Sequence, residues 1–198
     1  MNALTMLHEG RLFRPSVAAM VSSLFLLFGN TTVSSSQPTH EAKPMSVTVG
    51  SKAPAFTMFD TDRKPRTLAE FAGKKVVLAF YPGAFTGVCT KEMCAFRDAM
   101  AAFNSFNAQV VGVSVDSPFA NKAFADANKL TFPLLSDHTR ETSTAYAGVY
   151  QDFAGVQGYS ASKRAVYVID EKGVVTYVWV TDAPGTEPPY EEVKAALK

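Results

Sequence analysis

The feature that most constrains the fold of this chain is the apolar run KKVVLAFYP at residues 74–82. A strand whose apolar residues are continuous rather than alternating is buried on both faces, as in a sheet that has helices on either side. A second run of this kind, QVVGVSVD, occupies residues 109–116. Between the two runs, apolar residues recur at helical spacings, at Met93, Phe96, Met100 and Phe103. The sequence therefore predicts a strand–helix–strand unit, with the helix over residues 86–106.

Strands and helices continue to alternate along the rest of the chain. Ser117 and Pro118 have the residue types of an N-cap and a first helical position, and they predict that a helix follows. Within residues 164–180, two β-rich runs surround the turn Asp170–Gly173 and predict an antiparallel hairpin. The other expected elements are strands at residues 57–60 and 130–137 and helices at 119–129, 140–146 and 190–197. This order predicts an α/β fold, in which a central mixed β-sheet is flanked by helices.

Length and charge limit the classes of function. The chain has 198 residues, which is the length of one domain with a tail. Its 19 basic and 18 acidic side chains leave a net charge of +1. A charge this small provides no overall field that attracts nucleic acid or an anionic lipid surface. We therefore expect no nucleic-acid partner and no stable membrane association of the folded domain.

The first 44 residues differ from the rest. Arg11 and Arg14 precede the apolar run SVAAMVSSLFLLFG, which a polar stretch follows. The run is shorter than the ~20 residues that span a bilayer, and the order of basic, apolar and polar segments suits a signal peptide or an organellar targeting segment. Alternatively, Met45 is the true start of the protein. We expect residues 1–44 to be a targeting-like or disordered extension and residues 45–198 to form the folded domain.

Cys89 and Cys94 are the only two cysteines of the chain. They are too few for a secreted domain that is held together by disulfides, and by themselves they cannot complete a four-ligand zinc site. The three histidines are scattered, at His8, His40 and His138. We therefore expect no metal site and no other cofactor.

Cys89 lies where the first buried strand has ended and the helix begins. The N-terminus of a helix offers unpaired N–H groups and the positive end of the helix dipole. Both stabilise a thiolate, which is the nucleophilic form of cysteine, so this position favours reactivity. The alternative is that Cys89 is only a small core residue, since free cysteines are commonly buried.

The residues around Cys89 carry a resemblance to a known family. Pro82, Thr86 and Cys89 form the pattern P-x-x-x-T-x-x-C within YPGAFTGVCTKE. This segment resembles the active-site signature of the peroxiredoxins, which are thiol peroxidases with a thioredoxin-like fold, and the resemblance extends from GSKAPAF at residues 50–56 to the final helix. It implies that the Cys89 thiolate attacks a peroxide oxygen and becomes a sulfenic acid. It also implies that Thr86 orients peroxide and thiolate, and that Pro82 shields the site from water.

Two charged residues extend the resemblance. The segment RAVYVID at residues 164–170 matches the family pattern R-x-x-[FY]-x-[IL]-D, which implies that Arg164 supplies positive charge beside the thiolate. Glu92, one turn after Cys89, matches a glutamate that helps to hold this arginine. The alternatives are that Arg164 is a solvated charge at a strand end and that Glu92 is an exposed helix residue.

The segment CTKEMC resembles the Q-type peroxiredoxins, also called bacterioferritin comigratory proteins. In that branch a resolving cysteine lies five positions after the peroxidatic one on the same helix. The resemblance implies that Cys94 closes an intramolecular disulfide with Cys89, which thioredoxin or a similar dithiol then reduces. The segment PGAFTGVC is closer to the one-cysteine or fifth-type branches. The alternative for Cys94 is a core position on the helix.

The resulting hypothesis is a thiol-dependent peroxidase that reduces hydrogen peroxide and small organic hydroperoxides. We expect a monomer or homodimer in the cytoplasm, where the thiols have a reducing pool, with an organellar or exported form as the alternative. Three other functions stay open. The first is a thioredoxin-like disulfide oxidoreductase, although the CxxC motif of such enzymes is absent. The second is a peroxide sensor, redox relay or holdase without sustained turnover. The third is a structural domain in which Cys89 is unreactive.

Overall fold

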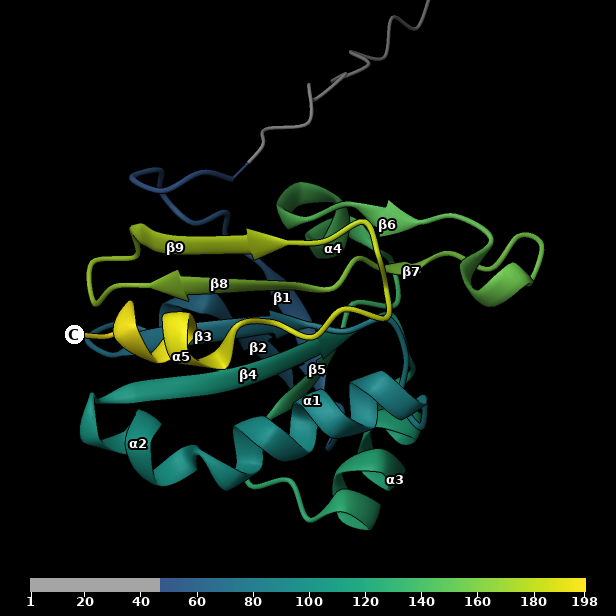
Figure 1. Ribbon diagram of the computed structural model, residues 1–198, viewed down its shortest axis with the longest axis horizontal. Helices are drawn as coiled ribbons and strands as arrows, with labels where there is room; N and C mark the ends of the chain where they lie inside the picture. Colours follow the sequence, from purple (N-terminus) through teal and green to yellow (C-terminus); the bar gives the residue numbers. More distant parts are fainter. Residues whose placement is uncertain (1–46) are drawn as a thin grey trace, which may run out of the picture. The chain divides into compact units, whose positions relative to one another are not determined.

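The computed structural model describes residues 47–198, which Figure 1 shows as a ribbon. The expected extension of residues 1–44 lies outside the described residues. The strands are β1 (Thr57–Asp60), β2 (Pro65–Thr67), β3 (Lys75–Phe80), β4 (Ala108–Ser114), β5 (Leu134–Ser136), β6 (Val149–Tyr150), β7 (Ala161–Ser162), β8 (Ala165–Ile169) and β9 (Val175–Val180). The helices are α1 (Gly87–Asp98), α2 (Met100–Ser105), α3 (Pro118–Asn128), α4 (Glu141–Tyr146) and α5 (Tyr190–Ala195), with short 3-10 helices η1 (Leu68–Phe71) and η2 (Phe153–Gly155). In this part of the chain, no helix is long and apolar enough to cross a membrane.

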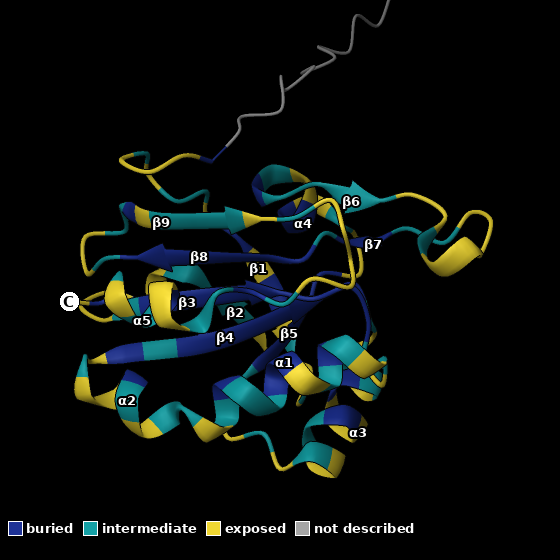
Figure 2. Ribbon diagram, viewed as in Figure 1, coloured by how far each residue is buried: buried dark blue, intermediate teal, exposed yellow. Residues whose placement is uncertain are grey.

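The central layer is a mixed sheet of seven strands in the order β2-β1-β5-β4-β3-β8-β9. Strand β3 pairs in parallel with β4 and antiparallel with β8, so it is covered at both edges. Every residue from Val76 to Phe80 is buried, as the continuous apolar run predicted, and β3 and β8 are dark blue in Figure 2. The predicted fold class, a central mixed β-sheet flanked by helices, is confirmed.

The side chains of β3 alternate between two hydrophobic clusters, one on each face of the sheet. Val77 and Ala79 belong to the cluster that includes buried residues of α1, α2, α3 and α5. Val76 and Leu78 belong to the cluster that includes residues of η1 and α4. Cys89 is a member of the first cluster. The sheet therefore holds Cys89 on the α1 face, at the end of β3 from which the chain enters the helix.

The expected helix over residues 86–106 is divided in two. Helices α1 and α2 are separated by Ala99, whose backbone has φ −93° and ψ 3°. Phe96 and Phe103 still pack on each other across the break, with ring centroids 5.8 Å apart. The apolar face therefore continues through the break. Because neither glycine nor proline marks this position, the periodicity of the sequence did not reveal it.

Two expected local structures are confirmed. The Ser117 hydroxyl caps α3 by accepting the N–H of Ala120 at 3.2 Å, with proline at the first helical position. The Asp170 carboxylate fixes the turn between β8 and β9 by accepting the N–H groups of Lys172 and Val174, at 2.9 and 2.8 Å.

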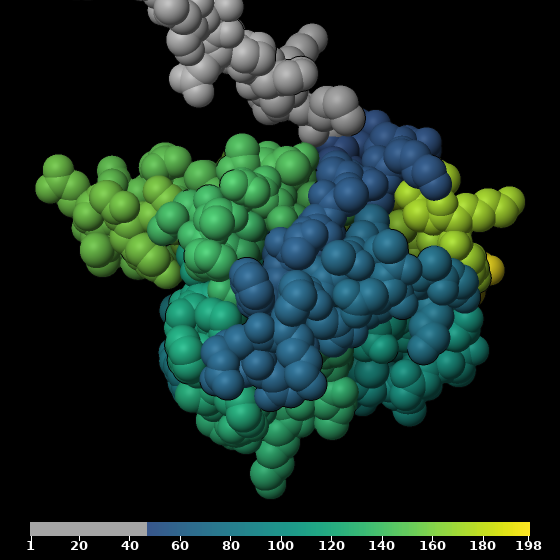
Figure 3. Space-filling model, turned by 180° about the vertical axis from the view of Figure 1, so that it is seen from behind, coloured from purple at the N-terminus to yellow at the C-terminus, as the bar shows by residue number. Residues whose placement is uncertain are grey.

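One segment that the sequence did not predict leaves the sheet between α4 and β8. Residues 149–162, called the excursion below, contain the short antiparallel pair β6–β7 and η2. The backbone between these strands turns tightly, because four of its residues have positive φ angles: Asp152, Ala154, Gly155 and Gly158. The excursion projects from the side of the sheet in Figure 1 and is the green lobe in Figure 3.

Candidate active site

The loop between β3 and α1 is fixed by two hydrogen bonds. The N–H of Ala84 donates to the carboxylate of Asp116, which follows β4, at 2.7 Å. The Thr86 hydroxyl donates to the carbonyl of Gly83 at 3.0 Å. Between these bonds Phe85 has φ +61°, a left-handed conformation that is rare for a bulky residue. Such strain persists only where the surroundings impose it, and it clusters at functional sites.

Cys89 is the third residue of α1, and its side chain is completely buried. The N–H groups of residues 87–89 lack partners within the helix, because the first helical bond joins the N–H of Thr90 to the carbonyl of Thr86, at 2.9 Å. These donors and the helix dipole stabilise negative charge beside the sulfur. Because the Thr86 hydroxyl donates to Gly83, its oxygen is left as an acceptor for a further hydrogen bond.

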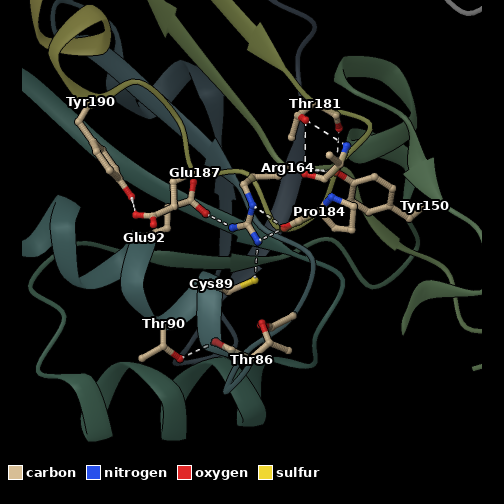
Figure 4. A network of polar contacts seen from close by, with 12 residues as sticks. Thr86, Cys89, Thr90, Glu92, Tyr150, Arg164, Thr181, Pro184, Glu187 and Tyr190 are labelled. Carbon is tan, nitrogen blue, oxygen red and sulfur yellow. Dashed lines mark hydrogen bonds and ion pairs between the residues drawn. The ribbon is translucent and has the colours of Figure 1, made fainter. Parts of the chain in front are cut away.

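Arg164 lies immediately before β8 and contacts the cysteine directly (Figure 4). Its Nη2 lies 3.4 Å from the sulfur of Cys89 and 2.7 Å from the carbonyl oxygen of Pro184, which its Nε also contacts at 3.1 Å. Its Nη1 donates to the carboxylate of Glu92. Arg164 and Glu92 are both buried, with 1% and 0% of the residue exposed. The alternatives of a solvated arginine and an exposed glutamate were therefore wrong.

The Glu92 carboxyl is only partly satisfied. Its Oε1 has no hydrogen-bond partner among the described residues. Burial raises the pKa of Glu92 to about 7, although the charge of Arg164 acts to lower it. Burial acts to lower the pKa of Arg164, but the nearby Glu92 and Cys89 outweigh it and raise the value. The guanidinium thus stays charged, while the carboxyl is partly protonated near neutral pH, so the positive charge beside Cys89 is not fully cancelled.

We expect the free energy of unfolding to depend on pH through Glu92. Its pKa is about 7 in the fold and returns to about 4.5 when the chain unfolds. Between these values the folded state binds more protons, so the free energy of unfolding falls as the pH rises from about 4.5 to about 7. The Glu92→Gln variant lacks this titration. The free energies of unfolding of the variant and of wild type can be measured by urea denaturation at about pH 5 and about pH 8. The difference, variant minus wild type, should be larger at about pH 8 by up to about 3 kcal/mol, because wild type loses stability between the two values. A pH-independent difference would contradict the buried, titrating carboxyl.

Residues 181–189, called the strap below, connect β9 to α5 and supply the proline carbonyl that holds the arginine. The beginning of the strap is fixed by the Tyr150 hydroxyl, which donates to the carbonyl of Thr181 at 2.7 Å. Its end is fixed to α1 by an ion pair between Glu187 and Lys91, at 2.5 Å. The sequence did not predict that the strap belongs to the site. The strap acts through a backbone carbonyl, which every residue type has, so no motif indicates it.

Cys94 lies on another side of α1 from Cys89. Its sulfur is 3.9 Å from the side-chain oxygen of Asn128 at the end of α3, where the Arg97 guanidinium donates to the Asn128 carbonyl at 2.6 Å. Five residues of helix give a rotation of about 140°, and they place the two cysteine Cα atoms roughly 8.5–9 Å apart. A disulfide needs less than about 7 Å. Both thiols are free in this structure, and the helix keeps them apart.

The fold brings together some of the site residues that the sequence predicted. Cys89, Glu92 and Arg164 form one buried cluster, with Thr86 at the N-cap of the same helix. Pro82 is buried in the loop before α1. Cys94 lies outside the cluster, against Asn128. Within residues 47–198, no group of three or more histidine, cysteine, aspartate or glutamate side chains is placed to hold a metal.

Comparisons with known proteins agree with this geometry. The AhpC/TSA family profile matches residues 49–178. Peroxiredoxin Q of the chloroplast of Sedum lineare is 44% identical over 133 residues, which are 67% of this chain and 69% of that protein. The chain belongs to the peroxiredoxin family. It is therefore a thiol peroxidase, an oxidoreductase, and its sheet and helices form the thioredoxin-like fold of that family.

Solved structures of other peroxiredoxins have the same fold. Peroxidoxin BcpB from Mycobacterium tuberculosis superimposes with a TM-score of 0.67 at 31% identity, covering 76% of this chain and 96% of that one. The reduced 2-Cys peroxiredoxin of Plasmodium vivax superimposes with a TM-score of 0.66, also at 31% identity, and covers 75% of this chain and 79% of its own.

Proposed function

We propose that this peroxiredoxin reduces hydrogen peroxide and organic hydroperoxides with Cys89 as the peroxidatic nucleophile. The observation that carries the proposal is the buried Arg164 guanidinium, 3.4 Å from the Cys89 sulfur at a helix N-terminus. Sulfur attacks one peroxide oxygen, the O–O bond breaks, and the other oxygen leaves as water or an alcohol. The products are a sulfenic acid on Cys89 and a leaving group whose negative charge the fixed donors stabilise.

The other site residues position these groups. Thr86 accepts a hydrogen bond from the peroxide O–H and thereby orients it for attack. Pro82 keeps bulk water from the thiolate, which strengthens the electrostatic effect of Arg164. Glu92 holds the guanidinium against the sulfur through its Nη1. The Pro184 carbonyl holds the same guanidinium from the other side, so Arg164 has little freedom to turn away.

Cys94 resolves the sulfenic acid in the second step. Its thiolate attacks the Cys89 sulfur, an S–S bond forms, the S–O bond breaks, and water leaves after protonation. A dithiol protein such as thioredoxin then reduces the disulfide. Because the helix separates the two cysteines beyond the reach of a disulfide, the first turns of α1 must unwind for this step. A slow unwinding gives a second peroxide time to convert the sulfenic acid to sulfinic acid.

We expect the oxidised protein to contain a Cys89–Cys94 disulfide. After one equivalent of peroxide, peptide mass mapping should find both cysteines in one linked species. Amide exchange across residues 87–96 should be faster in the oxidised than in the reduced form. The Cys94→Ser variant should react once and then accumulate sulfinic acid at Cys89 under excess peroxide. A free Cys94 thiol in oxidised wild type would show that the enzyme uses one cysteine.

The alternative function, a peroxide sensor, redox relay or holdase module, is distinguished by turnover. An enzyme consumes many equivalents of peroxide when thioredoxin, thioredoxin reductase and NADPH are present, whereas a sensor without turnover consumes about one per chain. We expect continuous NADPH oxidation that requires the protein. Consumption that stops near one equivalent with an active reducing system would favour the sensor.

The division of the chain, the location of the enzyme and the absence of further partners are proposed from the sequence. Residues 45–198 form the catalytic domain, and residues 1–44 are a separate extension. The enzyme works as a monomer or homodimer in the cytoplasm, where thiol reductants are available, or in an organelle or an exported form if residues 1–44 direct it there. It uses no metal or other cofactor and binds no nucleic acid.

A further inference from the structure

Met93 lies between the two cysteines on α1, directly before Cys94, and the proposed reaction does not use it. Its side chain is completely buried. It belongs to the hydrophobic cluster on the α1 face of the sheet, together with Cys89. A Cβ atom at Gly112 of β4 would come within 3.3 Å of the Met93 sulfur, so the thioether rests directly on this strand. The fold therefore shields the Met93 sulfur from peroxide in solution.

A disulfide between Cys89 and Cys94 changes the surroundings of Met93. The bond closes a ring that contains residues 90–93. In regular helix the two cysteine Cα atoms are roughly 8.5–9 Å apart, whereas a disulfide needs less than about 7 Å, so the backbone inside the ring must leave the helical conformation. Within the ring, the side chains of Glu92 and Met93 are completely buried. Because Met93 is adjacent to the cysteine that moves, closing the ring draws it out of the cluster.

We propose that Met93 is oxidised by peroxide only in the disulfide form of the enzyme, and that the resulting sulfoxide keeps α1 from forming again. The inference rests on the proposed resolving step and adds a modification site to it. The thioether sulfur attacks one peroxide oxygen, an S–O bond forms, and the O–O bond breaks. The transferred oxygen gives its proton to the other oxygen, which leaves as water, and the product is methionine sulfoxide. The methionine is oxidised and the peroxide is reduced, so no further reactant is needed.

The sulfoxide is incompatible with the resting position of the side chain. Oxidation converts a flexible apolar side chain into a polar one. A polar group that is buried without a hydrogen-bond partner destabilises the fold, and the cluster around Met93 is hydrophobic. When a reductant opens the disulfide, residues 90–93 therefore stay out of the helical conformation. Cys89 then lacks the helix N-terminus, and Glu92 no longer holds the guanidinium of Arg164, so the enzyme is inactive.

This oxidation differs in timing from the oxidation of Cys89. Sulfinic acid forms from the sulfenic acid before the disulfide closes, whereas Met93 reacts after the disulfide has closed and before it is reduced. The sulfoxide therefore accumulates when peroxide is abundant and the reductant is scarce. Enzymes that reduce methionine sulfoxide return it to methionine. The modification thus inactivates the peroxidase reversibly under these conditions.

The first test compares methionine oxidation in two forms of the protein. One is wild type that one equivalent of hydrogen peroxide has converted to the disulfide, and the other is Cys89→Ser, which cannot close the ring. Both are treated with excess hydrogen peroxide. Met100, half-buried on α2 outside the ring, is the internal control, and trypsin cleaves after Lys91 and Arg97 and so separates the two methionines. By mass spectrometry, we expect the rate of Met93 oxidation relative to Met100 to be at least about tenfold higher in the disulfide form.

The second test measures whether this oxidation inactivates the enzyme. The disulfide form is treated with excess hydrogen peroxide without reductant, freed of peroxide, reduced with dithiothreitol and then assayed for peroxide reduction. We expect wild type to lose activity in proportion to the sulfoxide on Met93. The Met93→Leu variant should keep its activity, because leucine is close to methionine in volume but is not oxidised. Met100→Leu is the matched control and should lose activity as wild type does.

The outcomes separate this inference from the proposed function. If one equivalent of peroxide produces no Cys89–Cys94 disulfide, it is the proposed resolving step that fails. If the disulfide forms and Met93 is oxidised no faster than in Cys89→Ser, the inference is overturned while the resolving step stands. This measurement needs no substitution at Met93, so it is decisive whether or not Met93→Leu folds. Equal inactivation of Met93→Leu and wild type, with Cys89 recovered as a thiol, would also overturn the inference.

Discussion

The Cys89→Ser variant is expected to lose peroxide reduction, with a second-order rate constant more than about a thousandfold below wild type. A serine hydroxyl is almost never ionised at neutral pH, whereas the site provides helix donors and a buried guanidinium that stabilise a thiolate. Serine is close in volume to cysteine, so the buried position remains filled. The loss should therefore be chemical and not structural.

Two measurements separate these causes. The thermal unfolding midpoint of Cys89→Ser should stay within a few degrees of wild type, which corresponds to roughly 1 kcal/mol for a domain of this size. Cys94→Ser serves as the matched cysteine control, since it keeps the first reaction with peroxide. A Cys89→Ser protein that consumes peroxide within tenfold of wild type would show that the nucleophile has been misassigned.

The Arg164→Met variant is expected to react with peroxide on the order of 10²–10³ more slowly, because it loses the donor that stabilises the thiolate and the developing negative charge. Methionine retains much of the apolar volume of the side chain. Stopped-flow measurement of the reaction with hydrogen peroxide gives the second-order rate constant. Arg63→Met, which removes an exposed guanidinium that lies over the ring of Phe119, is the matched control and should react like wild type.

The removal of Arg164 also leaves Glu92 buried without its partner. Breaking such a buried pair costs about 3–5 kcal/mol, so the single variant is expected to be less stable. The double variant Arg164→Met with Glu92→Gln removes the unpaired charge and should recover part of this stability without recovering the rate. A rate that returns with stability would contradict a direct role of Arg164 at the sulfur.

The sequence predicted the sheet and the centre of the site because both depend on strong local signals. A continuous apolar run such as residues 76–80 is compatible with few environments other than the middle of a covered sheet. The threonine and proline at fixed spacings before Cys89 carried the resemblance to the peroxiredoxin signature, and this resemblance predicted the chemistry of the site. The match of residues 164–170 to the family pattern likewise predicted Arg164, which contacts the sulfur although the two residues are 75 positions apart.

Other parts of the site carry no such signal. The strap acts through the carbonyl of Pro184, and any residue type supplies a carbonyl. Asp116 anchors the active-site loop by accepting one N–H across the sheet, a contact that depends on how β4 ends relative to β3. The turn of the excursion depends on four residues with positive φ, and two of them, Asp152 and Ala154, are of types that do not indicate this conformation in a sequence. These features arise from tertiary structure.

The central claim, that the Cys89 thiolate attacks peroxide, is tested most directly by trapping its first product. The Cys94→Ser variant is treated with one equivalent of hydrogen peroxide in the presence of dimedone, which reacts with sulfenic acids, and the peptides are analysed by mass spectrometry. We predict that the dimedone adduct forms stoichiometrically on the peptide that contains Cys89. An unmodified Cys89 peptide, with the peroxide still present in solution, would contradict the claim.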